Sequence, residues 1–109
     1  MNNKYISMIR GDTLSFNLEF EGLETDLSSA FFTCKESYSH KETVFQKSLN
    51  NGITKLETGK YHVRVAPDDT AEIEAGKYYY DLQIGAGEDI YTVLIGVLEI
   101  IPDVTTQGG

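Results

Sequence analysis

Hydrophobic and polar residues alternate along several stretches of the chain. In residues 13–20 the apolar positions are Leu14, Phe16, Leu18 and Phe20. Polar residues stand between them, and residues 60–65 and 78–84 repeat this period of two. An amphipathic helix would instead place apolar residues three and four positions apart. The alternation therefore predicts strands with one buried and one solvent-exposed face.

Shorter apolar stretches and turn residues complete this pattern. The further strands that we predict are residues 5–9, 30–36, 43–48, 53–56 and 91–101. Asn50-Asn51-Gly52 suits the positive backbone angles of a tight hairpin, and the glycine-rich residues 85–89 close a second hairpin. Residues 67–73 begin with a proline followed by acids, a pattern typical of a helix N-terminus. We expect a helix of one or two turns there, crossing between two sheets.

These elements predict an all-β fold class. Many short strands without a long helix between them favour an immunoglobulin-like two-sheet antiparallel β-sandwich of about seven or eight strands. One short helical crossover would link the two sheets. The length of 109 residues fits one domain, residues 1–109, with one hydrophobic core.

A run after the predicted crossover resembles the tyrosine corner of immunoglobulin-like domains. Gly76 is followed two residues later by Tyr78, and Tyr80 stands two residues beyond. We therefore treat these three residues as structural. The Tyr78 hydroxyl is predicted to bond the backbone of the crossover. Tyr80 would occupy the place of a disulfide cysteine in antibody domains, so that aromatic packing replaces the bridge.

The last predicted strand is apolar on both sides. The interface candidates on it are Tyr91, Leu94, Leu98 and Ile100. A long apolar strand invites pairing with a neighbouring molecule if nothing in its own domain covers it. Two alternatives stay open here, burial inside the domain or burial against a partner. Gly96 is predicted to mark a β-bulge that shifts the alternation.

The net charge of −8 limits the possible partners. Nucleic-acid binding depends on cations that neutralise phosphates, so we expect no nucleic-acid partner. Residues 68–89 hold seven acids against one lysine. This segment is expected to be a solvated face, with a docking site for a basic partner or a cation as the alternative. The candidate calcium ligands would be Asp68, Asp69, Glu88 and Asp89.

No motif for catalysis, a cofactor or zinc occurs in the sequence, so we expect no enzyme. The single cysteine, Cys34, is predicted to be a small buried hydrophobe, and His40 and His62 to be surface residues. No apolar run approaches the ~20 residues of a membrane span, and no signal peptide is evident. We expect that the chain does not associate with a membrane. We also expect that it assembles in a reducing bacterial cytoplasm.

A series of short motifs runs through nearly the whole chain in a recognisable order. The motifs are Arg10-Gly11-Asp12-Thr13, Thr25-Asp26-Leu27-Ser28, Gly59-Lys60-Tyr61-His62-Val63, Pro67-Asp68-Asp69-Thr70, Gly76 to Leu82, Thr92 to Ile100 and Asp103-Val104-Thr105. This series resembles a group of small β-sandwich structural proteins of tailed bacteriophages and is similar to the N-terminal domain of phage baseplate upper proteins. The resemblance implies a virion part that docks onto other virion proteins, the major capsid or tail and baseplate proteins, or forms homo-oligomers.

Within that resemblance we expect an accessory protein, of the decoration or cement kind, on the capsid or tail surface. The chain lacks the heptads or collagen-like repeat of a fibre-bearing protein after Val104. Two alternatives remain, a baseplate component and a carbohydrate-binding or host-adhesion module. A sugar platform would be built from Tyr38, Tyr79 and Tyr91. The tripeptide Arg10-Gly11-Asp12 matches an adhesion motif, but it is also a good turn.

Overall fold

The computed structural model describes residues 2–37, 39 and 41–104. The regular structure in these residues is β-sheet apart from one helix of four residues, so the predicted all-β fold class with one short helix is confirmed. The elements are β1 (Asn2–Asn3), β2 (Ile6–Ile9), β3 (Leu14–Glu19), β4 (Ser29–Lys35), β5 (Phe45–Leu49), β6 (Gly52–Glu57), β7 (Lys60–Val65), α1 (Pro67–Thr70), β8 (Gly76–Ala86) and β9 (Asp89–Ile101).

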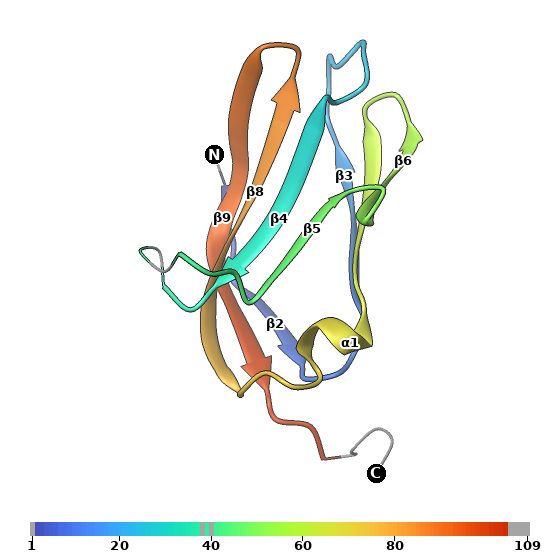
Figure 1. Ribbon diagram of the computed structural model, residues 1–109. Coiled ribbons are helices and arrows are strands. Elements are labelled where there is room, and N and C mark those ends of the chain that lie inside the picture. Colours follow the sequence, from blue (N-terminus) through green and yellow to red (C-terminus); the bar gives the residue numbers. More distant parts are fainter. Residues whose placement is uncertain (1, 38, 40, 105–109) are drawn as a thin grey trace.

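The strands form two layers around one core (Figure 1). One layer runs in the order β9–β8–β4–β5 and carries β1 and β2 along the outer edge of β9. The other layer is β6–β7–β3. Backbone pairing continues from β5 to β6, which joins the layers along one side. The architecture therefore lies between a sandwich and an open barrel.

Three pairings depart from the fully antiparallel arrangement that we predicted. β1 and β2 both run parallel to β9, along one edge of that strand. Asn50 and Gly52 do have positive φ angles, 65° and 98°, but they do not close a tight antiparallel hairpin. The last residues of β5 pair in parallel with the first residues of β6. The turn thus carries the chain around a corner from one layer to the other.

The core consists of the inward side chains of both layers. Phe32 of β4 is fully buried and contacts Phe16 of β3 edge-on, with ring centroids 5.7 Å apart. This contact joins the two layers. Tyr80 of β8 packs against the same phenylalanine at 5.4 Å. Full burial of a side chain of this size contributes about 1.5–3 kcal/mol, so these rings are a main source of stability.

The crossover between β7 and β8 is bound by side-chain contacts to β5 and to the turn between β2 and β3. The Ala66 N–H donates to the Asp69 carboxylate over 2.7 Å, which satisfies one of the free donors at the start of α1. Asp69 also pairs with Lys47 of β5 at 2.7 Å. Thr70 is fully buried, and its hydroxyl accepts a hydrogen bond from the Gly11 N–H at 2.9 Å. The predicted helical crossover is therefore present, and its helix ends at Thr70, three residues early.

Candidate interaction surfaces

Most apolar side chains on the last strand, β9, are buried within the domain itself. Leu98 and Ile100 are 0% and 1% exposed and belong to the core, and Leu94 is half-buried against that core. Leu98 and Ile100 are core residues, so their assignment as interface candidates was wrong, whereas that of the partly exposed Leu94 stays a prediction. β9 lies between β8 and the N-terminal strands, so both of its edges are paired within the domain, and the core covers its inner face. Tyr91, the fourth candidate, is 51% exposed near the β8–β9 turn.

Gly96 does not mark the bulge that the sequence predicted. The register of β8 and β9 shifts instead between the Leu82–Leu94 and Gln83–Thr92 pairs, which leaves Val93 as the extra residue. A Cβ on Gly96 would lie 2.0 Å from the carbonyl oxygen of Lys4. A glycine is therefore needed because the backbone between β1 and β2 passes directly over it.

The tyrosine-corner prediction is confirmed. The Tyr78 hydroxyl donates a 2.6 Å hydrogen bond to the carbonyl of Glu74, in the crossover. Burial of this phenol, the largest effect, raises its pKa, with a further contribution from nearby carboxylates. Tyr80 packs in the core, and its hydroxyl donates to the Lys4 carbonyl over 2.7 Å, so aromatic packing holds this position as predicted. Gly76 opens β8 with a φ of 151°, an angle that side chains rarely permit.

One end of the molecule carries adjacent exposed apolar side chains, which we call the apolar end: Ile9, Ile101, Pro102 and Val104. Ile9 of β2 is paired with Ile101 of β9, and the two are 43% and 39% exposed. Val104, just beyond, is fully exposed. A hollow of about 290 Å³ lies beside them, lined by Ile9, Pro102 and Val104 of the apolar end and by residues 10–12 and Asp103. Neighbouring exposed apolar side chains next to a hollow are typical of protein contact sites.

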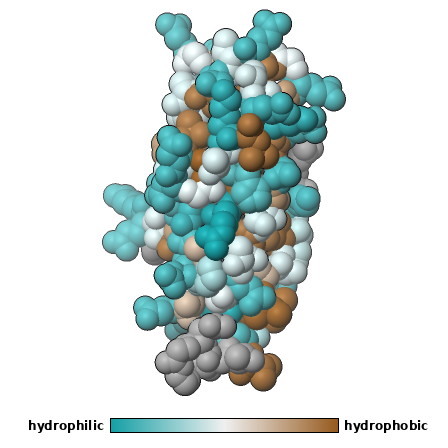
Figure 2. Space-filling model, turned by 90° about the vertical axis from the view of Figure 1, so that its right-hand side faces the viewer, coloured by the Kyte–Doolittle hydropathy of each residue, from teal (hydrophilic) through white to brown (hydrophobic). Residues whose placement is uncertain are grey.

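By contrast, the side of the molecule near β3 and β6 is mainly hydrophilic, with small separate hydrophobic patches (Figure 2). The exposed residues of β3 are the polar side chains between its inward apolar positions. Isolated apolar residues on such a surface need no partner. The contrast makes the apolar end the better candidate for a contact with another protein.

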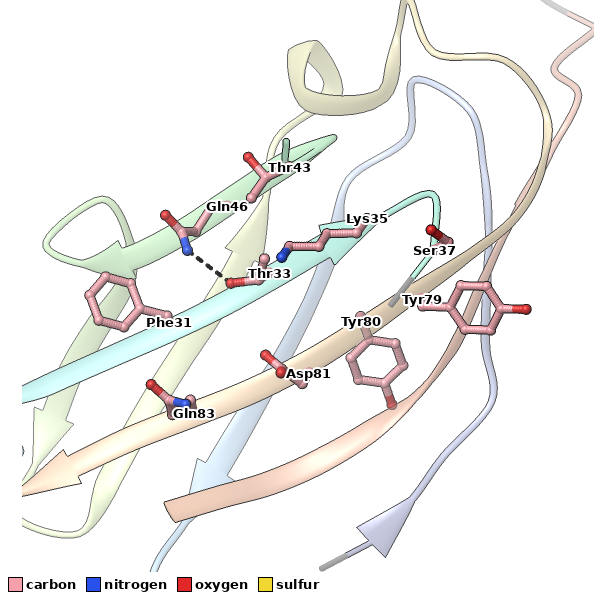
Figure 3. A pocket seen from close by; sticks show the side chains of 10 residues that line it. All are labelled: Phe31, Thr33, Lys35, Ser37, Thr43, Gln46, Tyr79, Tyr80, Asp81 and Gln83. Atoms are coloured by element: carbon pink, nitrogen blue, oxygen red, sulfur yellow. Dashed lines mark hydrogen bonds between the residues drawn. The ribbon is translucent and has the colours of Figure 1, made fainter. Parts of the chain in front are cut away.

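A second hollow, of about 420 Å³, lies on the outward face of β4, β5 and β8 (Figure 3). We call it the sheet groove. Its lining residues are Phe31, Thr33, Lys35, Ser37, Thr43, Gln46, Tyr79, Tyr80, Asp81 and Gln83. Figure 3 shows Phe31 at one end and Tyr79 at the other, with polar side chains between them. Tyr80 points away from the rest, toward the Lys4 carbonyl.

Strand register explains why these polar residues converge. Thr33 of β4 lies opposite Asp81 of β8 on one side and opposite Gln46 of β5 on the other. The Gln46 amide donates to the Thr33 hydroxyl over 2.9 Å. Phe31 lies opposite Gln83, one step along the strands. Because residues two apart point to the same face, three neighbouring strands present one continuous set of polar groups.

The groove holds one acid and one base at its centre. Desolvation raises the pKa of the Asp81 carboxyl, and the positive charge of Lys35 acts against this in part. In the described part of the chain, Asp81, Lys35 and Gln83 take part in no side-chain hydrogen bond or ion pair. Their donors and acceptors are therefore open to water or to a ligand.

The cysteine behaves as predicted. Cys34 is fully buried, and burial raises the pKa of its thiol to about 12, so it is a core residue and a poor nucleophile.

His62 is half-buried on β7, where its Nδ1 lies 2.6 Å from the Asn17 side-chain oxygen. His40 and Tyr38 lie outside the described residues. Tyr79 and Tyr91 do not form a common platform, because register places them on opposite faces of the sheet.

The acidic segment is divided between two ends of the molecule. Asp68 and Asp69 lie in α1, and Glu88 and Asp89 lie at the β8–β9 turn, at the far end of the eleven-residue strand β8 (Figure 1). That strand spans about 35 Å, so the four candidate calcium ligands do not meet. Among residues 2–37, 39 and 41–104, no group of three or more His, Cys, Asp or Glu side chains is placed to hold a metal ion.

The Arg-Gly-Asp tripeptide is built into the turn between β2 and β3. Arg10 is held by Asp103 at 2.8 Å and by the Ile73 carbonyl at 3.2 Å. Gly11 has a φ of 82°. The arginine therefore has a structural role, which accounts for the tripeptide without adhesion. No helix in the described residues is long and apolar enough to cross a membrane.

The comparisons with known proteins add no relative. No protein-family model matches the chain, and no curated protein is significantly similar to it. The resemblance to phage structural proteins therefore rests on the order and spacing of the sequence motifs.

Proposed function

We propose that this chain is a non-catalytic structural protein of a tailed-phage particle, an accessory protein that docks onto the capsid or tail surface. The motif series along the chain supports the family. The main support for docking onto another protein is the apolar end. There the paired residues Ile9 and Ile101 are exposed beside Val104 and a hollow. A partly apolar surface with a hollow, on a rigid all-β scaffold, suits permanent contact with a partner protein.

The charge of the chain fits the outside of a particle. A net charge of −8 disfavours contact with the packaged nucleic acid and keeps free copies apart before they dock. Decoration of a surface also requires a domain that folds before it binds. The buried aromatic contacts and the anchored crossover supply that rigidity.

The first experiment asks whether the chain is part of the particle. Particles purified from the phage that encodes it should contain a 12.2 kDa protein at tens to hundreds of copies. Labelling with an antibody, viewed by electron microscopy, then distinguishes a capsid or tail-tube position from the baseplate. Absence of the chain from purified particles would refute the proposal.

The second experiment tests the apolar end. Purified wild-type chain should bind particles of a phage from which its gene has been deleted. The double variant Ile9→Glu/Ile101→Glu should bind at least about tenfold more weakly, because it places charges in the contact. Ile90→Glu is the matched control, since Ile90 is 59% exposed at the opposite end of β9. Equal binding of both folded variants would show that docking uses another surface.

A further inference from the structure

We propose that the sheet groove is a binding site for a neutral oligosaccharide, a function beyond docking and independent of it. Its size of about 420 Å³ falls within the range of small-ligand sites. Apart from the inward Tyr80, the groove is formed by outward side chains of β4, β5 and β8 and by Ser37 and Thr43 beside them, none of which belongs to the buried core. A set of polar groups this dense is not needed for stability, because water can satisfy each of them.

The polar groups suit hydroxyl groups of a sugar. Gln46 and Gln83 each offer an amide donor and an acceptor, Asp81 offers acceptors, and Lys35 offers donors. Each can bind one or two neighbouring hydroxyls. Asp81 and Gln83 have no hydrogen-bond partner among the described residues, and Asp81 is already partly desolvated. A ligand that donates to this carboxylate would therefore gain a strong, charge-assisted hydrogen bond.

Aromatic rings stand at the two ends of the polar groups. Phe31 is 36% exposed, and Tyr79 is half-buried at the opposite corner (Figure 3). They lie in rows four residues apart along the paired strands, a distance of about 13 Å. A short oligosaccharide spans such a distance, and the apolar faces of its rings can pack on aromatic side chains.

The charges in the groove and on the whole chain favour a neutral ligand. Asp81 and Lys35 offset each other within the groove, and the chain as a whole is strongly negative. An anionic saccharide or a phosphate would be repelled by the overall field. A cationic ligand would meet Lys35 in the same hollow.

A peptide is a poorer fit for this surface. Peptides that bind sheets often add a strand at an open edge. β4 is paired on both sides, with β5 and β8, and β8 is paired with β4 and β9. The groove thus offers side chains alone, and most of them are polar.

Binding is tested with the full chain labelled with ¹⁵N and titrated with maltotriose, cellotriose and chitotriose in separate NMR experiments. We expect at least one of these neutral trisaccharides to shift the amide signals of Thr33, Gln46, Asp81 and Gln83. Asp81→Ala and Phe31→Ala should each weaken that binding at least about tenfold. Thr54→Ala, on the exposed side of β6, and Tyr91→Ala are matched controls that should leave it unchanged.

Three results would overturn the proposal. The first is the absence of shifts at the groove with all three sugars at millimolar concentration. The second is binding that the Asp81 and Phe31 variants leave intact. In the third, these variants would lose binding to phage particles instead of sugars, which would make the groove a protein-docking surface. Loss of particle binding by the Ile9/Ile101 variant leaves the sugar titration unaffected, so the two proposals fail separately.

Discussion

Replacing Tyr78 by phenylalanine removes one hydroxyl and keeps the ring. In the folded chain this hydroxyl donates to the Glu74 carbonyl over 2.6 Å, and the side chain is 8% exposed. A hydrogen bond of this kind contributes about 0.5–1.5 kcal/mol, and a carbonyl left partly buried without its donor adds to the cost. We expect the free energy of unfolding to fall by about 1–2 kcal/mol. For a domain of this size the melting temperature should fall by about 4–10 °C.

The measurement is urea unfolding followed by circular dichroism, with thermal melting as a second readout. Tyr91→Phe is the matched control, because Tyr91 is half exposed and its hydroxyl has no hydrogen-bond partner among the described residues. The control should change the free energy of unfolding by less than about 0.5 kcal/mol. If Tyr78→Phe is as stable as wild type, the hydroxyl does not tie β8 to the crossover and the tyrosine-corner reasoning is wrong.

Three further predictions follow from other contacts. Gly96→Ala should detach the N-terminal segment, because the new Cβ would collide with the Lys4 carbonyl, and hydrogen exchange should speed up in residues 2–9. Cys34 should not react with a thiol reagent at pH 8 in the native state, since burial raises its pKa to about 12, and should react in urea. Arg10 lowers the pKa of Asp103 in the folded state, so this pair stabilises the chain above the ordinary aspartate pKa and its contribution is lost as the pH falls through the lowered value. Asp103→Asn should therefore reduce stability at neutral pH and leave it unchanged in strong acid, as measured by urea midpoints.

Local patterns predicted the strands well because the period of two reflects burial on one side of each strand. Residues 60–65 were predicted without error, and β3 and β8 differ from their predicted ranges only at the ends. The tyrosine corner was also predictable, since Tyr78 and its acceptor Glu74 are four residues apart. Contacts of this kind depend on nearby residues alone.

Long-range contacts could not be predicted in the same way. The need for Gly96 comes from Lys4, at the other end of the chain, so no neighbouring residue indicates it. The sheet groove depends on Thr33 lying opposite both Asp81 and Gln46, a register that the sequence does not specify. The alternation of residues 31, 33 and 35 could have placed Phe31 on the outward side of its strand. It could not have indicated which strands lie next to it.

The position of β9 between β8 and the two N-terminal strands sets an order of events during synthesis. β1 and β2 have no strand partner until β9 has left the ribosome. At ordinary rates of translation that delay is about 5–20 s, during which β1 and β2 lack the strand with which they pair. The domain is therefore expected to fold late and as one unit, and a nascent chain stalled before residue 89 should remain bound to chaperones.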